Sequence, residues 1–246
     1  MGVRLKGYRI CDGVEIFPGG SALVKEENAL IVADMHLGCE SSLEYQGISL
    51  PRVQSREIQK YLKIMIDAIE PSKVIVAGDL KHNFSRNLNQ EWQDVYRFVK
   101  LLRGRVPLEV IKGNHDNYLG SILREYRIPM KSEITCAGIR IVHGHAGSLS
   151  GGSTIMGHLH PSIRLRDSTG ASLKSPCFLF DKGRHVLVLP ALSLVASGTD
   201  VISQVSSDDL SPLLSDEGLS SFVPIAFSDS KPLKFPNVGR LRKMRQ

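Results

Sequence analysis

The chain has 246 residues, 42% of them hydrophobic, and a formal net charge of +6 at pH 7. This composition suits a globular protein with a sizeable core, and the positive charge favours anionic partners such as nucleic acid or phosphorylated molecules. The longest apolar run, 186–196, contains Pro190 and is far shorter than the roughly 18 residues of a membrane helix. Neither a membrane span nor a secretory leader is therefore expected.

The four cysteines are scattered along the chain without a C-x-x-C pair. This usage is typical of reduced thiols, so we expect a cytoplasmic protein. A chain of this length and hydrophobic content can bury one core, which predicts a single domain over residues 1–246 with a basic C-terminal tail at about 240–246.

Strands and helices are predicted to alternate in the first half of the chain. Apolar runs that end in glycine or polar residues predict buried strands at 29–34, 73–79 and 107–114. Apolar residues at helical spacing predict two connecting helices, from about Pro51 to Ile69 and from about Asn87 to Leu102. Trp92 is expected on the buried face of the second helix.

Mostly strands are predicted after residue 136, at positions 138–143, 154–158, 163–166, 177–180 and 185–189. The segments 222–227 and 232–235 contain proline and are expected to be edge strands. The serine-rich segment 203–221 is expected to be a loop or partly disordered. The overall pattern indicates an α/β fold, in which sites form at the C-terminal ends of the strands.

Acidic and imidazole side chains follow several of these apolar runs. They occur in five segments: Asp34-Met-His36, Gly78-Asp79-Leu-Lys-His82, Gly113-Asn114-His115-Asp116, His143-Gly-His145 and Gly157-His158-Leu-His160. Two divalent ions about 3.5–4 Å apart can bind a phosphate ester, activate water and stabilise the leaving oxygen. The five segments offer enough nitrogen and oxygen ligands for such a pair of ions.

Residue spacing suggests how these ligands group. Side chains at i and i+2 of a strand share a face, so Asp34 and His36 are expected to bind together, and so are the two histidines 158 and 160. The carboxylate of Asp79 can lie between the ions. Ligation by oxygen and imidazole without thiolate favours Mn, Fe, Co, Ni or Zn over a structural zinc site. We assign no functional role to His145 or His185.

The same motifs resemble those of the calcineurin-like metallophosphoesterases. The resemblance implies a two-sheet β-sandwich flanked by helices, in four layers α/β/β/α, and two metal ions, with Mn the first expectation. It implies two ligand sets, bridged by Asp79: Asp34, His36, Asp79 and His160 on the first ion, with Asp79, Asn114, His143 and His158 on the second. His115 corresponds to the family's histidine that contacts the phosphate or protonates the leaving group.

Longer stretches, including HLGCESSLEYQGISLPRVQ and GHLHPSIRLRDSTG, resemble small prokaryotic phosphoesterases related to the nuclease subunit SbcD, some of them ligase-associated DNA-damage-response endonucleases. His82 stands where many members of the superfamily have a second acid. Double-strand-break repair nucleases share this histidine, which favours a phosphodiester substrate and a catalytic role for His82. A merely structural role, as a hydrogen-bond partner of Asp79 or a nearby loop, stays open.

These observations predict a two-metal phosphodiesterase, a nuclease linked to DNA repair, with nucleic acid or a small phosphodiester as substrate and a DNA-repair helicase or ligase as a candidate partner. Four basic residues near the motifs are candidate phosphate contacts: Arg52, Arg56, Lys81 and Arg86. The alternatives are a phosphomonoesterase, a cyclic-nucleotide phosphodiesterase, or a non-catalytic DNA-repair binding subunit. The sequence does not indicate the oligomeric state.

Overall fold

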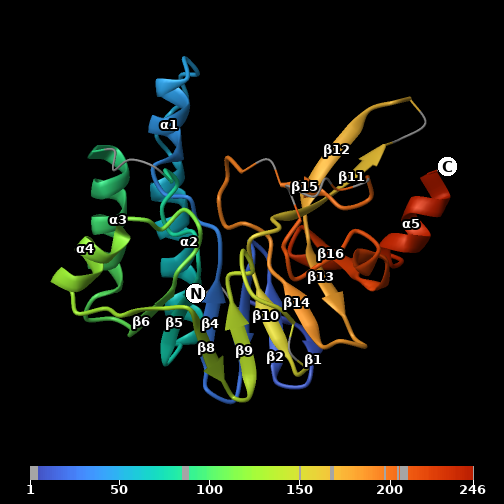
Figure 1. Ribbon diagram of the computed structural model, residues 1–246, viewed down its shortest axis with the longest axis horizontal. Helices are drawn as coiled ribbons and strands as arrows, with labels where there is room; N and C mark the ends of the chain where they lie inside the picture. The colour runs from blue at the N-terminus through green and yellow to red at the C-terminus, as the bar shows by residue number, and fades with distance from the viewer. Residues whose placement is uncertain are drawn as a thin grey trace.

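Two seven-stranded sheets pack face to face in the computed structural model, with helices on the outer face of the first sheet and at the C-terminal end of the chain (Figure 1). The structure describes residues 5–84, 89–149, 151–166, 169–196, 198–203, 205 and 210–245. The predicted α/β sandwich flanked by helices is confirmed.

The first sheet has the strand order β1-β2-β3-β4-β5-β6-β7. Neighbours from β1 to β4 are antiparallel, and neighbours from β4 to β7 are parallel. The strands are β1 Tyr8–Cys11, β2 Val14–Phe17, β3 Ser21–Val24, β4 Ala29–Val32, β5 Lys73–Ala77, β6 Leu108–Ile111 and β7 Met130–Lys131. The three strands predicted in this region correspond to β4, β5 and β6, the central parallel part of the sheet.

Helices α2 (Gln54–Ile69), α3 (Asn89–Leu102) and α4 (Leu119–Glu125) pack on this sheet through an apolar cluster that includes Leu62 and Phe98. Helix α2 begins at Gln54, so the predicted start at about Pro51 is three residues too early. Trp92 is 36% exposed, because the buried face of α3 is formed by Val95, Phe98, Val99 and Leu102 with Glu91 and Asp94. The sequence also did not predict α4 or the short helix α1 (Cys39–Tyr45).

The second sheet has the order β17-β16-β13-β14-β10-β9-β8. Its strands are β8 Glu133–Cys136, β9 Ile139–Val142, β10 Thr154–Met156, β13 Phe178–Asp181, β14 Val186–Val188, β16 Val223–Ser228 and β17 Lys231–Lys234. The edge position predicted for 232–235 is confirmed by β17. The edge position predicted for 222–227 is wrong, because β16 pairs with β17 on one side and with β13 on the other.

A smaller sheet of order β12-β11-β15 stands beside the sandwich and was not predicted. It consists of β11 Pro161–Arg166, β12 Ser172–Pro176 and β15 Thr199–Asp200. Strands β11 and β12 project from the body as an antiparallel pair, on the other side of the molecule from α1 (Figure 1). An apolar cluster that includes Ile31, Ile75 and Ile155 fills the space between the two large sheets.

The basic C-terminal segment forms helix α5 (Val238–Arg245) instead of a solvated tail. Val238 is fully buried, and the Arg242 guanidinium donates to the Asp216 carboxylate at 2.7 Å and to the Val201 carbonyl at 3.1 Å. The helix is thereby attached to the body of the protein. Among the described residues, no helix has both the length and the apolar character needed to cross a membrane.

Candidate metal centre

The loops after parallel strands β4 and β5 lie side by side and continue the sheet pairing beyond the strands themselves. The Asp34 amide donates to the Gly78 carbonyl at 3.1 Å, and the His36 amide donates to the Asp79 carbonyl at 2.9 Å. From the loop after β6, the His115 amide donates to Asp79 Oδ1 at 2.9 Å. The predicted gathering of motif loops at one edge of the sheet is therefore present.

Five of the acidic and imidazole residues here adopt left-handed backbone conformations. Their φ angles are 55° at Asp34, 45° at His36, 49° at Asp79, 70° at His158 and 47° at His160. Strand geometry therefore does not bring these side chains together, and that argument from the sequence was wrong. A non-glycine residue in this region is strained by roughly 1–3 kcal/mol, so the surrounding hydrogen bonds must hold the loops in place.

One group of possible metal ligands consists of Asp34, His36 and His160, whose ligand atoms all lie within 4.8 Å of one another. Asp34 is fully buried, and its Oδ2 accepts the His158 amide at 2.9 Å. Its Oδ1 lies 3.4 Å from His160 Nε2 and accepts no hydrogen bond from the described residues. A buried carboxylate oxygen without a donor is unfavourable unless a cation meets it, so this group fits a metal ion.

A second group consists of Asp79, His143 and His158. The backbone carbonyl of Ala77 lies 3.0 Å from His143 Nδ1 and orients the ring, so that Nε2 lies 3.0 Å from Asn114 Oδ1 and 3.4 Å from Asp79 Oδ2. His158 and His160 therefore belong to different groups, in contrast to the pairing expected from their spacing.

The carboxylate of Asp79 lies between the two groups. Its Oδ2 is 3.4 Å from His143 Nε2 in one group and 3.9 Å from His36 Nε2 in the other. A carboxylate oxygen placed in this way is suited to bridging two cations.

Three glycines make room for these carboxylates and imidazoles. A Cβ at Gly113 would lie 2.0 Å from Asp79 Oδ1, one at Gly157 would lie 2.6 Å from Asp34 Oδ2, and one at Gly78 would lie 2.3 Å from His143 Nδ1. These contacts are too short for any larger residue. Glycine is therefore required at these three positions by the close packing of the ligands.

The carboxylates and imidazoles also perturb one another's protonation. Burial lowers the pKa of His36 to about 3 and that of His158 to about 4. Burial would also lower the pKa of His143, but the hydrogen bond to Asp79 and the charges of Asp34 and Asp79 raise it to about 9. In the protein without metal, a protonated His143 thus partly offsets the two carboxylates, and a metal ion would have to displace that proton.

A third grouping brings His36 together with His82 and His115. The His82 and His115 rings are stacked with centroids 5.7 Å apart, and His115 Nδ1 is hydrogen-bonded to the His82 carbonyl. These three imidazoles carry no negative charge to offset a cation. The two groups that contain aspartate are therefore the better candidates for metal sites.

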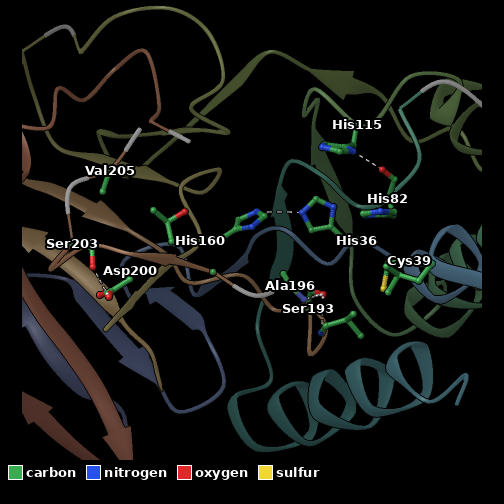
Figure 2. Close-up of a pocket in the computed structure, with 14 residues that line it drawn as sticks. His36, Cys39, His82, His115, His160, Ser193, Ala196, Asp200, Ser203 and Val205 are labelled. Atoms are coloured by element: carbon green, nitrogen blue, oxygen red, sulfur yellow. Dashed lines mark hydrogen bonds between the residues drawn. The ribbon is translucent and has the colours of Figure 1, made fainter. Parts of the chain in front are cut away.

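A cavity of about 600 Å³ opens beside these histidines. Figure 2 shows His36, His82, His115 and His160 along it, with Ser193 and Ala196 nearby and Asp200, Ser203 and Val205 further along the wall. The sequence assigned no role to residues 193–205, although part of this segment resembles the phosphoesterases. Burial raises the pKa of the Cys39 thiol in this wall to about 12, so it stays protonated and is a poor metal ligand.

Gln54 connects the cavity wall to the first group and was missed by the sequence analysis. Its side chain is fully buried; Nε2 donates to the His36 carbonyl at 2.9 Å, and Oε1 accepts the Ser193 hydroxyl at 2.7 Å. A glutamine in the first turn of an amphipathic helix has no distinguishing pattern in one sequence, so only the structure assigns this role.

Three of the four candidate phosphate contacts, Arg52, Arg56 and Lys81, lie outside the lining of this cavity. Arg52 is paired with Glu44 at 2.6 Å and, with exposed Arg56, lines a separate groove of about 680 Å³ that includes residues of α2 and α3. The Lys81 ammonium is buried against the Asn83 carbonyl and Glu91, so it faces protein and not a ligand. Arg86 lies outside the described residues.

The two histidines without a predicted role differ in position. His145 lies next to the second group, with its ring centroid 5.1 Å from that of His143. His185 precedes β14 and is exposed at a different cavity.

Comparison with solved structures finds a similar fold in the nuclease MPE of Pseudomonas putida. The similarity has a TM-score of 0.68 at 18% sequence identity and covers 93% of this chain and 100% of that one. The phosphoesterase Yfce of E. coli matches more weakly, with a TM-score of 0.40 and 13% identity over 70% of this chain and 83% of that chain. No protein with a curated description matches the sequence significantly.

The family model described as calcineurin-like phosphoesterase matches residues 28–165, which is more than half of the chain and contains all five motif segments. Together with the two aspartate-containing ligand groups, this match places the protein among enzymes that hydrolyse phosphate esters with the help of metal ions. The chain belongs to the calcineurin-like phosphoesterase family and is a metal-dependent phosphoesterase.

Proposed function

We propose that this protein is a two-metal phosphodiesterase that cleaves nucleic acid and acts in DNA repair. The observation that carries the proposal is the wall of the cavity beside the two ligand groups. Among the described residues, its lining contains Leu43, Val195, Ala196 and Val205, and neither lysine nor arginine. A phosphodiester has one charge and two organic substituents, which fit a wall without cationic side chains better than a phosphomonoester dianion does.

Two ions fit the ligands that the family resemblance implies. Asp34, His36 and His160 would hold the first, Asn114, His143 and His158 the second, and Asp79 would bridge them. When bound, a pair of divalent ions activates water and stabilises charge on the phosphate oxygens. Mn²⁺ is our first candidate, with Fe, Co, Ni and Zn as alternatives, since imidazole and carboxylate ligands suit all of them.

The role of His115 follows from its hydrogen bond. A carbonyl oxygen can only accept, so His115 Nδ1 carries the proton that it shares with the His82 carbonyl. Nε2 is then the other ring nitrogen, 4.0 Å from Asp79 Oδ2; in the imidazolium form it carries a second proton, which it can give to the leaving oxygen. The positioned imidazole acts as a general acid or a hydrogen-bond donor to the phosphate.

We assign His82 to orientation of the scissile group. Its ring stacks on His115 and packs edge-on against His36 at 5.4 Å, and its buried Nδ1 has no hydrogen-bond partner among the described residues. His82 also lines the cavity beside the two ligand groups, so its ring is placed to contact a bound substrate.

The proposal includes a cellular context. The resemblance to ligase-associated endonucleases and the nuclease name of the similar Pseudomonas structure favour a DNA-repair setting with a helicase or ligase partner. The four cysteines are unpaired, which supports a reducing, cytoplasmic location. Arg52 and Arg56 remain candidates for contacts to a polymer backbone away from the cleaved bond.

The test compares hydrolysis of bis(p-nitrophenyl) phosphate, p-nitrophenyl phosphate, 2′,3′-cyclic AMP and single-stranded and duplex DNA and RNA, each with Mn²⁺. We expect bis(p-nitrophenyl) phosphate and at least one nucleic acid to be cleaved faster than the monoester and the cyclic nucleotide. A preference for the monoester or the cyclic nucleotide would instead identify one of the two alternative enzymes. If the Mn²⁺-loaded protein turned over none of these substrates but bound DNA, it would be a binding subunit.

A further inference from the structure

An aromatic side chain of unassigned role stands beside the candidate metal centre. The ring of Phe84 is 57% exposed and meets the His115 ring edge-on, with centroids 6.4 Å apart and an interplanar angle of 83°. Scattered exposed apolar residues are ordinary on protein surfaces. Phe84 differs from them because it contacts the histidine that we place next to the reacting phosphate.

Hydrogen bonds hold Phe84 in this position. His115 is bonded to the His82 carbonyl, and the Asn117 side-chain amide donates to the Phe84 carbonyl at 3.4 Å. Segment 82–84 is therefore attached to the loop after β6 at both of its ends. The ring of Phe84 is placed by the same backbone that places His115.

Phe84 also extends a cluster of imidazole rings. His36 packs against His115 with centroids 5.1 Å apart and against His82 at 5.4 Å, His82 stacks on His115 at 5.7 Å, and the exposed Phe84 contacts the His115 ring. Leaving a phenylalanine in water forgoes the stabilisation that its burial would contribute. A flat apolar ligand that covers the ring would recover part of this stabilisation.

We propose that Phe84 forms a nucleobase subsite, on which a base next to the scissile phosphate stacks. The inference rests on the proposed phosphodiesterase function and specifies its substrate. Stacking on an aromatic ring accepts any base, because every base has a π face. A base inside a duplex already stacks on both sides, so the subsite favours unpaired nucleotides, whose bases can leave the stack at little cost.

The test uses three diesters that share one leaving group: thymidine 5′-(p-nitrophenyl phosphate), thymidine 3′-(p-nitrophenyl phosphate) and methyl p-nitrophenyl phosphate. For Phe84→Ala, we expect kcat/KM to fall about 5- to 150-fold more for at least one nucleoside ester than for the methyl ester, the range given by one stacked base. Phe84→Trp should restore the preference. Leu233→Ala, which removes an exposed apolar side chain from β17, is the matched control and should change neither ratio.

An equal loss on all three esters would overturn the proposal, since Phe84 would then only hold His115 in place. So would wild-type selectivity in Phe84→Ala. If the wild-type protein hydrolysed no diester, the proposed function would fail, and binding of thymidine 5′-phosphate to the Mn²⁺-loaded protein would decide about the subsite. Calorimetry should then show weaker binding by Phe84→Ala, and an unchanged Kd would reject the subsite.

Discussion

Replacing Asp79 by asparagine removes a negative charge that lies 3.4 Å from His143 in one ligand group and 3.9 Å from His36 in the other. The amide oxygen can still accept the His115 N–H, which donates to Asp79 Oδ1 at 2.9 Å, so the loops should keep their conformation. The substitution therefore tests the charge at the centre of the site with little change in shape.

Loss of a residue that merely supports a metal ligand typically weakens metal binding about 10- to 100-fold. A bridging ligand acts on both ions directly, so we expect Asp79→Asn to weaken binding of each by at least about 100-fold, the upper end of that range. Activity on bis(p-nitrophenyl) phosphate should fall together with bound metal. Elemental analysis after gel filtration measures the number of ions per chain.

His115→Ala is the reference for this experiment. Its imidazole is not in either aspartate-containing group, so this variant should lose turnover while it keeps both ions. Two ions per chain and normal turnover in Asp79→Asn would refute the bridging assignment.

Three further substitutions test other parts of the structure. If His82 binds a substrate oxygen, His82→Ala should lower kcat roughly 10²-fold with unchanged metal content, whereas wild-type rates on nucleic acid and bis(p-nitrophenyl) phosphate with both ions bound would reject this role. Gln54→Ala breaks several buried hydrogen bonds. It should reduce the free energy of unfolding by about 2–4 kcal/mol in urea denaturation of the metal-free protein. A loss below about 0.5 kcal/mol, the low end for a single hydrogen bond, would contradict the connecting role of Gln54. Arg242→Ala should detach α5 and expose it to limited proteolysis. The hydrogen bond with Arg242 lowers the pKa of Asp216, so this contribution to stability is present above about pH 4 and is lost as the pH falls further, and the variant should resemble the wild-type protein in acid.

The sequence predicted the central part of the fold because its signal there is local. Runs such as Val74-Ile-Val-Ala77 are β-branched, buried on both faces and followed by glycine, which suits only a central parallel strand. Helices α1 and α4 have seven residues each, too few for an apolar stripe to repeat, and were missed. Trp92 was misplaced because two polar residues, Glu91 and Asp94, occupy buried positions of α3.

The candidate site, too, could be predicted only in part. The residue types at Asp34, Asp79 and the motif histidines are enough to indicate metal ligands, because few other functions require so many imidazoles and carboxylates. Spacing predicted that Asp34 and His36 lie together, and they do. It failed for His158 and His160, since the loops leave the strand conformation at left-handed residues. The distribution of His158 and His160 between two groups came from the family resemblance and agrees with the geometry.

Apolar residues near the candidate site could not be identified from a single sequence, for a different reason. Val195 in the cavity wall and Phe84 beside His115 are ordinary apolar residues, and their importance depends on what tertiary structure places beside them. Only the structure shows that they lie beside the candidate metal centre.

The first ligand group has a consequence for how the protein resists unfolding. His36 follows β4 of the first sheet and His160 follows β10 of the second sheet, and the two residues are 124 positions apart in the sequence. An ion held by both would act as a crosslink that closes a long loop in the unfolded chain, and closure of such loops restricts the unfolded ensemble in the way a disulfide does. Chelation should therefore loosen the junction between the two sheets before it affects either sheet alone, and amide hydrogen exchange should rise first in the loops that carry the ligands.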